Sequence, residues 1–223
     1  MQIDFADLIG KKIEVEISGG NFHIGNLLDA GLDIIVLYDG RSFIYIPTVH
    51  IQRLKEVIIK EEEDISYDPP SDNPIETDTI SFRKALTIAK GSFVQVYVTG
   101  NKSIHGYLTS IMNDYFVFHS PVYKSMLISM NHVKWLIPYP PNTTPYSLKS
   151  ENLPLMPKIA SLARSFDEQL KKFENQLIIL DGGDHPEKIG LLQKIRNNKM
   201  TLITAEGETV YRNVEHIKTI QLP

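Results

Sequence analysis

The chain contains no cysteine among its 223 residues. This absence excludes disulfide bonds, thiolate nucleophiles and zinc sites built on thiolates. An excess of positive charge is missing as well: 23 Lys and Arg stand against 27 Asp and Glu, for a formal net charge of −4. Because neutralising phosphates with Lys and Arg supplies most of the affinity for a nucleic-acid backbone, this balance argues against nucleic acid as a partner.

Long apolar runs are absent too. No stretch is long enough to span a bilayer, and no basic-then-apolar leader opens the chain, so we expect neither membrane insertion nor export by a recognisable signal. The composition is otherwise that of an ordinary globular protein, with 42% hydrophobic and 22% charged residues.

Catalytic motifs are also lacking. The sequence has no GxSxG elbow, Walker loop, HExxH pair, DxDxDG loop or dinucleotide-binding glycine pattern. Its glycine pairs, Gly19-Gly20 and Gly182-Gly183, fall in predicted turns between strands, whereas a phosphate cradle needs a helix N-terminus behind the glycines. We therefore predict a protein that is not an enzyme and needs no cofactor.

The chain does contain one sequence pattern that occurs three times, over Ile13–Leu54, Val94–Leu136 and Leu177–Ile220. Three glycines and three histidines fall into register, with spacings of 81 and 84 residues for the glycines and 82 and 84 for the histidines. These structural repeat positions are Gly25, Gly106, Gly190, His50, His132 and His216. A repeat of this length is a whole small domain rather than a solenoid unit, so we predict three related domains in a row.

Each repeat is predicted to fold as five short strands. In the first, Ile13–Ile17 alternates apolar and acidic residues, the period of a half-buried strand. Further strands are expected over Phe22–Leu28, Leu32–Tyr38, Ser42–Ile46 and Ile51–Leu54. Gly25 inside the second strand indicates a bend or bulge. Five short strands, one of them bent, favour a small closed barrel that hides its own edges.

A short helix is expected before each barrel, over Ser81–Lys90 and Ser161–Glu174, with only the fragment Asp4–Ile9 in the first repeat. Ser165 and Glu168 have the spacing of a capping box. The prediction for the whole chain is therefore repeat 1 over 1–59, an acidic linker over 60–79, repeat 2 over 80–138, a Pro-rich linker over 139–158 and repeat 3 over 159–223. The fold class is mostly β.

The recurrent histidines allow two interpretations. If the barrels pack around a pseudo-threefold axis, His50, His132 and His216 converge as metal ligands. Alternatively, each imidazole bonds the backbone at the entry to the last strand. We favour the second interpretation, in which these residues are structural and hold no metal.

At the level of fold, Phe22–Leu27 followed by Ile34–Leu37 resembles the first motif of Sm-like proteins: an apolar residue, Gly, a spacer, Leu, and then an apolar strand. The second motif of that family, an Arg-Gly or Lys-Gly pair that helps to form an RNA pocket, has no counterpart, because the matching region reads Phe43–Pro47. The resemblance implies three tandem Sm-like five-stranded barrels without implying RNA binding.

More specifically, Gly182–Leu192 (GGDHPEKIGLL) and Val210–Ile220 (VYRNVEHIKTI) are similar to the repeated signature of the spore coat protein B family of endospore-forming bacteria. The first two repeats match in outline, with a shorter turn. The low-complexity Ser/Lys-rich tail often found in such proteins is not expected here, because the sequence runs to Pro223.

This resemblance implies a non-enzymatic building block of the spore coat, made in the mother-cell cytoplasm, whose partners are other coat proteins and itself. The alternative is a nucleic-acid-binding Sm-like module. It would use a basic face of the third repeat, formed by Lys188, Lys194, Arg196, Lys199, Arg212 and Lys218.

Overall fold

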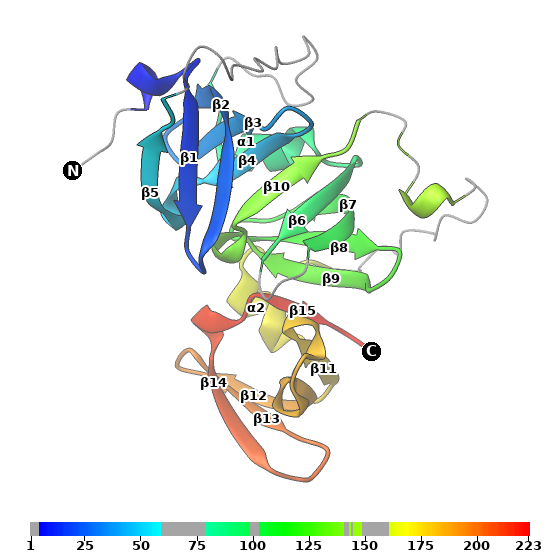
Figure 1. Cartoon of the computed structure of the whole chain (residues 1–223). Helices are drawn as coiled ribbons and strands as arrows, with labels where there is room; N and C mark the ends of the chain where they lie inside the picture. The colour runs from blue at the N-terminus through cyan, green and yellow to red at the C-terminus, as the bar shows by residue number, and fades with distance from the viewer. Residues whose placement is uncertain (1–4, 59–78, 99–102, 141–142, 144, 149–160) are drawn as a thin grey trace. The chain divides into compact units, whose positions relative to one another are not determined.

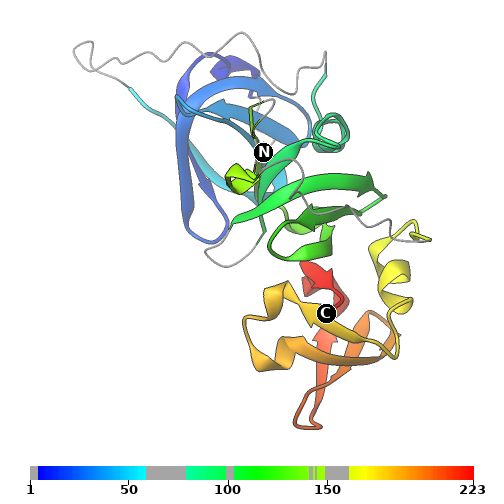
Figure 2. The same cartoon turned by 90° about the vertical axis from the view of Figure 1, so that its right-hand side faces the viewer.

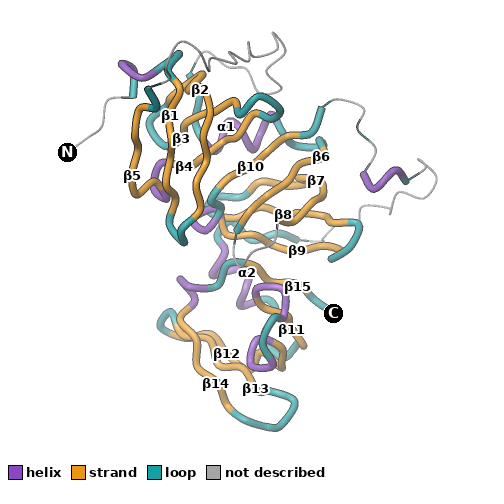
Figure 3. The backbone as a smooth tube through the Cα atoms, viewed as in Figure 1, coloured by secondary structure: helices purple, strands orange, loops and turns teal. Residues whose placement is uncertain are grey.

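The computed structural model describes residues 5–58, 79–98, 103–140, 143, 145–148 and 161–223. The predicted acidic linker, 60–79, lies outside these residues except for its last position, and the Pro-rich linker, 139–158, is described only in part. In the described part the chain is mostly β, as predicted, and every strand pairing is antiparallel (Figures 1 and 3).

The described residues form fifteen strands, five in each repeat. The first repeat has β1 (Lys12–Ile17), β2 (Asn21–Ala30), β3 (Ile34–Tyr38), β4 (Phe43–Pro47) and β5 (Ile51–Glu56). The second has β6 (Phe93–Tyr97), β7 (Ser103–Ile111), β8 (Tyr115–Ser120), β9 (Lys124–Ser129) and β10 (Trp135–Pro138). The third has β11 (Leu177–Leu180), β12 (Ile189–Arg196), β13 (Lys199–Ile203), β14 (Thr209–Asn213) and β15 (Thr219–Gln221).

Two α-helices precede the second and third repeats, α1 (Phe82–Ile88) and α2 (Phe166–Lys171). Both begin at a serine cap: the Ser81 hydroxyl accepts from the amide of Lys84, and that of Ser165 from the amide of Glu168. The second helix is shorter than the predicted 161–174, because its cap residue, Ser165, has extended backbone angles. Before the first strand of the first repeat lies the 3-10 turn η1 (Ala6–Leu8), where the helical fragment Asp4–Ile9 was predicted.

A further 3-10 turn recurs in all three repeats. One lies between the fourth and fifth strands of each: η2 (Thr48–His50), η4 (Met130–His132) and η9 (Val214–His216). Two more lie between β11 and β12, η7 (Asp181–Gly183) and η8 (Pro186–Lys188), and η5 covers Pro145–Ser147. The recurrent turn sets the direction in which each fifth strand leaves its repeat.

The chain forms two compact units, which do not coincide with the three repeats. Unit 1 comprises Met1–Tyr97 and Lys134–Thr143, and unit 2 comprises Val98–Val133 and Thr144–Pro223. The second repeat therefore gives β6 and β10 to unit 1 and β7, β8 and β9 to unit 2. The strand order is β6-β10-β4-β3-β2-β1-β5 in unit 1 and β14-β13-β12-β11-β15-β9-β8-β7 in unit 2.

Each unit has its own apolar core. In unit 1, alternation along β1 buries Ile13, Val15 and Ile17, which pack with the side chains of β3 and β4 and with Tyr97 and Trp135. In unit 2, residues of β8 and β9 join those of the third repeat in one cluster. Figure 2 shows the third repeat, in yellow to red, with α2 beside its strands.

Candidate functional site

The three register-matched glycines lie in equivalent places, in the second strand of each repeat. A Cβ atom added at Gly25, Gly106 or Gly190 would lie 2.5, 2.3 or 2.2 Å from a backbone carbonyl oxygen of the neighbouring strand. Two residues after each glycine the strand register shifts, as a bulge does. Only glycine lets these strands approach so closely, so the three positions shape the sheet.

The three histidines each end one of the recurrent 3-10 turns. His50 Nδ1 lies 3.4 Å from the Ser18 hydroxyl, and His132 Nε2 lies 2.7 Å from the carbonyl oxygen of Glu215. Among the residues that the structure describes, no group of three or more His, Asp or Glu side chains is placed to hold a metal ion. The contacts of His50 and His132 tie each turn to another part of its own unit.

The main surface that the sequence did not reveal is a strand junction that joins one repeat to the next. The fifth strand of the second repeat, β10, pairs with β4 of the first, with Leu136 opposite Tyr45. The fifth strand of the third repeat, β15, pairs with β9 of the second, with Ile220 opposite Leu127. Counted from the aligned histidines, Leu136 corresponds to Ile220 and Tyr45 to Leu127. The two junctions therefore have the same antiparallel register.

The side chains at the centre of both junctions are buried. Leu136 and Ile220 are each 1% exposed, and their partners Tyr45 and Leu127 are 0% and 2% exposed. Burying side chains of this size contributes roughly 1.5–3 kcal/mol each. The pairing of a fourth strand with the fifth strand of the following repeat is therefore a strong contact, and this chain makes it twice.

An aromatic stack supports the junction in unit 1. The rings of Tyr97 and Trp135 lie parallel with centroids 3.8 Å apart, and His23 meets the same indole edge-on at 4.6 Å. Burial lowers the pKa of His23, and the Asp39 carboxylate partly offsets that effect. The ammonium of Lys134 donates to the carbonyl oxygen of Ser18. These contacts hold the first residues of β10 against β1 and β2.

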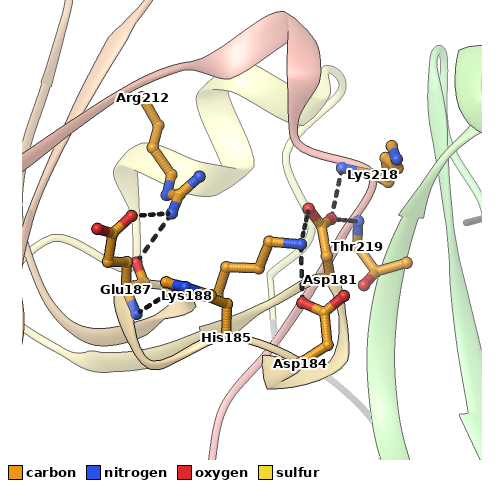
Figure 4. Close-up of polar contacts among 8 residues, drawn as sticks. All are labelled: Asp181, Asp184, His185, Glu187, Lys188, Arg212, Lys218 and Thr219. Atoms are coloured by element: carbon orange, nitrogen blue, oxygen red, sulfur yellow. Dashed lines mark hydrogen bonds and ion pairs between the residues drawn. The ribbon is translucent and has the colours of Figure 1, made fainter. Parts of the chain in front are cut away.

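In unit 2 the strand that enters the junction is held by a carboxylate, as Figure 4 shows. One oxygen of Asp181, the residue after β11, accepts from the backbone amides of Lys218 and Thr219 at 3.0 and 3.1 Å. The ammonium of Lys188 lies 3.5 Å from the other oxygen and 2.8 Å from Asp184. Lys188 also lowers the pKa of Asp184, first through their hydrogen bond. Asp181 thus fixes the start of β15, the strand that enters the junction.

The same loop binds β14. The guanidinium of Arg212 lies 3.3 Å from the Glu187 carboxylate and also donates to the Glu187 carbonyl oxygen (Figure 4). In the sequence, Lys188 and Arg212 were candidates for a basic face. Here both are matched by carboxylates, while Lys194, Arg196 and Lys199 lie exposed on the hairpin of β12 and β13. Lys218, the sixth member of the predicted face, is half-buried, so three of the six residues form an exposed cluster on this hairpin.

In the described part of the chain, no helix has the length and apolar character needed to cross a membrane.

Comparison with known proteins gives two matches. Residues 165–220, from the cap of α2 to β15, match a family model described as "YwrJ third domain". The chain is 45% identical over 214 residues to a Bacillus subtilis (strain 168) protein called "Uncharacterized protein YwrJ", and the match covers 95% of each chain. The family model thus covers α2 and the strands of the third repeat from β11 into β15.

Proposed function

This chain belongs to the YwrJ family, and we propose that it is a non-enzymatic scaffold protein that works through contacts between its repeated small barrels. The observation that carries the proposal is the junction of fourth and fifth strands, which recurs in one register with buried Leu, Ile and Tyr side chains. A surface that joins repeat to repeat inside one chain is suited to joining proteins to one another.

The Sm-like barrel is the fold that we propose for each repeat. In the first and third repeats the strand order is fourth, third, second, first and fifth, with the bulge after the glycine in the second strand. Such a sheet curls strongly at the bulge, and its first strand lies between the second and the fifth. The order leaves a fourth strand at one edge and a fifth strand at the other, which is what the junctions use.

We place this scaffold in the bacterial spore coat, on the similarity of Gly182–Leu192 and Val210–Ile220 to the spore coat protein B signature. The test is location. A fluorescent fusion of the chain in a sporulating bacterium should form a shell around the developing spore, and coat extraction of mature spores should release the chain. A fusion that stays diffuse in the mother cell, together with coat extracts that lack the chain, would refute the assignment.

A second candidate, an RNA-binding module, depends on the hairpin of β12 and β13. There Arg196 of β12 lies opposite Lys199 of β13, and Lys194 precedes Arg196 on β12, with all three side chains exposed. Filter binding of RNA across a salt series tests this function. Loss of affinity in a variant with all three residues changed to Gln, with a log–log salt slope near −2 in the parent, would support it. Absence of salt-dependent binding would rule it out.

A further inference from the structure

Two strand edges lack a partner in the described part of the chain. In unit 1, β5 pairs with β1 alone, and in unit 2, β14 pairs with β13 alone. β14 and β5 are the first and last strands in the strand order, and Figures 1 and 3 label both. β5 is the fifth strand of the first repeat and β14 is the fourth strand of the third. They are the two strand types that meet at the junctions.

The exposure of these edges differs sharply from that of their equivalents. Tyr211 of β14 corresponds to Tyr45 and Leu127, which are 0% and 2% exposed, yet Tyr211 is 71% exposed. Leu54 of β5 corresponds to Leu136, which is 1% exposed, but is itself only half-buried. A large aromatic side chain therefore stands in solvent at the position where the other two repeats are covered.

The backbone of both edges is also oriented for pairing. The amide of Val214 donates to Asn198 on the β13 side, and the amide of Val57 donates to Lys12 on the β1 side. Backbone amides alternate between the two sides of a strand, so those of Tyr211 and Leu54, three residues earlier in each case, point away from the existing partner strand. An edge with free donors and acceptors is a template for another strand.

We propose that β14 of one molecule pairs with β5 of a second molecule, antiparallel, with Tyr211 opposite Leu54. This register is that of the two junctions within the chain. The inference deepens the proposed scaffold function and rests on it for biological meaning, since it names a second copy as the partner. Because the two edges differ, the contact is head-to-tail, and repetition closes a ring or extends a filament.

The charges at this junction are compatible with the pairing. Arg53 would lie opposite Arg212, but each brings carboxylates with it. Arg53 lies 2.9 Å from both Glu14 and Glu16, and Arg212 lies 3.3 Å from Glu187. Three carboxylates thus surround two guanidinium groups, which leaves no excess of positive charge to repel the partner.

Disulfide trapping tests the register, because the natural chain has no cysteine. The proposal places Lys55 opposite Val210, as Gln221 lies opposite Met126. Such non-hydrogen-bonded pairs have Cα atoms about 4.5 Å apart, within the range of a disulfide.

Under mild oxidation, a Lys55→Cys chain mixed with a Val210→Cys chain should form a mixed dimer. The control mixes Lys55→Cys with Tyr211→Cys, whose side chain faces the other side of the strand. Equal trapping in both mixtures would overturn the register.

Light scattering of the full chain over a concentration series tests the association itself. The mass should rise at least twofold above 25.3 kDa. Tyr211→Asp places a charge in the junction and should return the mass to that of one chain. Tyr211→Leu is the matched control, because leucine occupies the equivalent position at Leu127, and it should still assemble. Circular dichroism checks that each variant is folded. A monomeric parent, or assembly unaffected by Tyr211→Asp, would overturn the proposal.

The failure of this pairing can be told from failure of the scaffold function. A chain that reaches the spore coat but stays monomeric when purified would overturn the pairing alone. A chain that assembles through Tyr211 but is absent from the coat would overturn the proposed location alone.

Discussion

Replacing Gly190 with valine should unfold the third repeat. A Cβ atom at this position would lie 2.2 Å from the carbonyl oxygen of Ile203, 2.9 Å from its carbonyl carbon and 3.1 Å from Leu202 Cγ. Carbon–oxygen contacts between strands are about 1 Å longer. The atoms in the way are largely backbone, so β12 and β13 would have to separate.

Forcing one extra methylene into a packed site costs about 1–3 kcal/mol. For a unit of this size, roughly 2 kcal/mol lowers the melting temperature by about 10 °C. Gly190→Ala should show a loss of this order, and Gly190→Val, which adds two further carbons, should unfold the repeat.

The assay combines two measurements that report on different units. The single tryptophan, Trp135, lies in unit 1, so its fluorescence follows that unit. Limited proteolysis with mass spectrometry follows the third repeat. Gly190→Val should give early cleavage after residue 161 with an unchanged fluorescence transition. Gly207→Asn is the control: nothing lies within 4 Å of a Cβ there, and asparagine tolerates its φ of +80°. A Gly190→Val chain whose third repeat resists protease as the parent does would refute the reasoning.

Three further outcomes follow from the contacts described. Asp181→Ala leaves two backbone amides without their acceptor and should destabilise unit 2 by about 1–3 kcal/mol, measured by urea unfolding. Asp181→Asn keeps one acceptor oxygen and should recover most of this loss. Leu136→Ala, at the buried junction with Tyr45, should cost about 2–5 kcal/mol, read from the tryptophan transition; a loss below 1 kcal/mol would show that the junction adds little. Burial lowers the pKa values of His23 and His119 below 6.5, so the unfolded chain binds more protons at acidic pH than the folded chain does. The stability that these neutral histidines contribute should be present above pH 6.5 and should be lost as the pH drops towards 5. In urea unfolding at a series of pH values, His119→Gln should lose less stability over this range than the parent.

Much of the local structure could be predicted from the sequence because it depends on neighbouring residues. The alternation of Ile13–Ile17 gave a half-buried strand, and the serines at 81 and 165 gave two helix starts. The glycine at 25 indicated the irregularity that the β2–β3 register shows. Each of these features follows from the period or chemistry of a few adjacent residues.

The junctions could not be predicted in the same way. Leu136 and Tyr45 are separated by 91 positions, and no local pattern states which strand will cover which edge. A signal was nevertheless present. β4 reads Phe-Ile-Tyr-Ile-Pro and is buried throughout, as continuous apolar strands are, while β14 reads Thr-Val-Tyr-Arg-Asn and alternates. The difference separates a covered fourth strand from an uncovered one.

The role of Asp181 was also beyond sequence reasoning. Asp181-Gly182-Gly183 signals a turn, and a turn is what forms. That the carboxylate then accepts from Lys218 and Thr219 depends on the return of the chain 37 residues later. Only the folded arrangement of β11 and β15 brings these groups together.

The division of the second repeat between two units has a consequence for synthesis. Unit 1 is complete only when β10 has been made, so a nascent chain must emerge beyond Pro138 before β4 is covered. Until then the edge that holds Tyr45 is open on a partly folded intermediate, which exposes it to aggregation. Cutting the gene at the repeat boundaries would make that state permanent. A fragment ending near residue 59 should be poorly soluble, and shorter versions of this protein need to respect the borders of the units rather than those of the repeats.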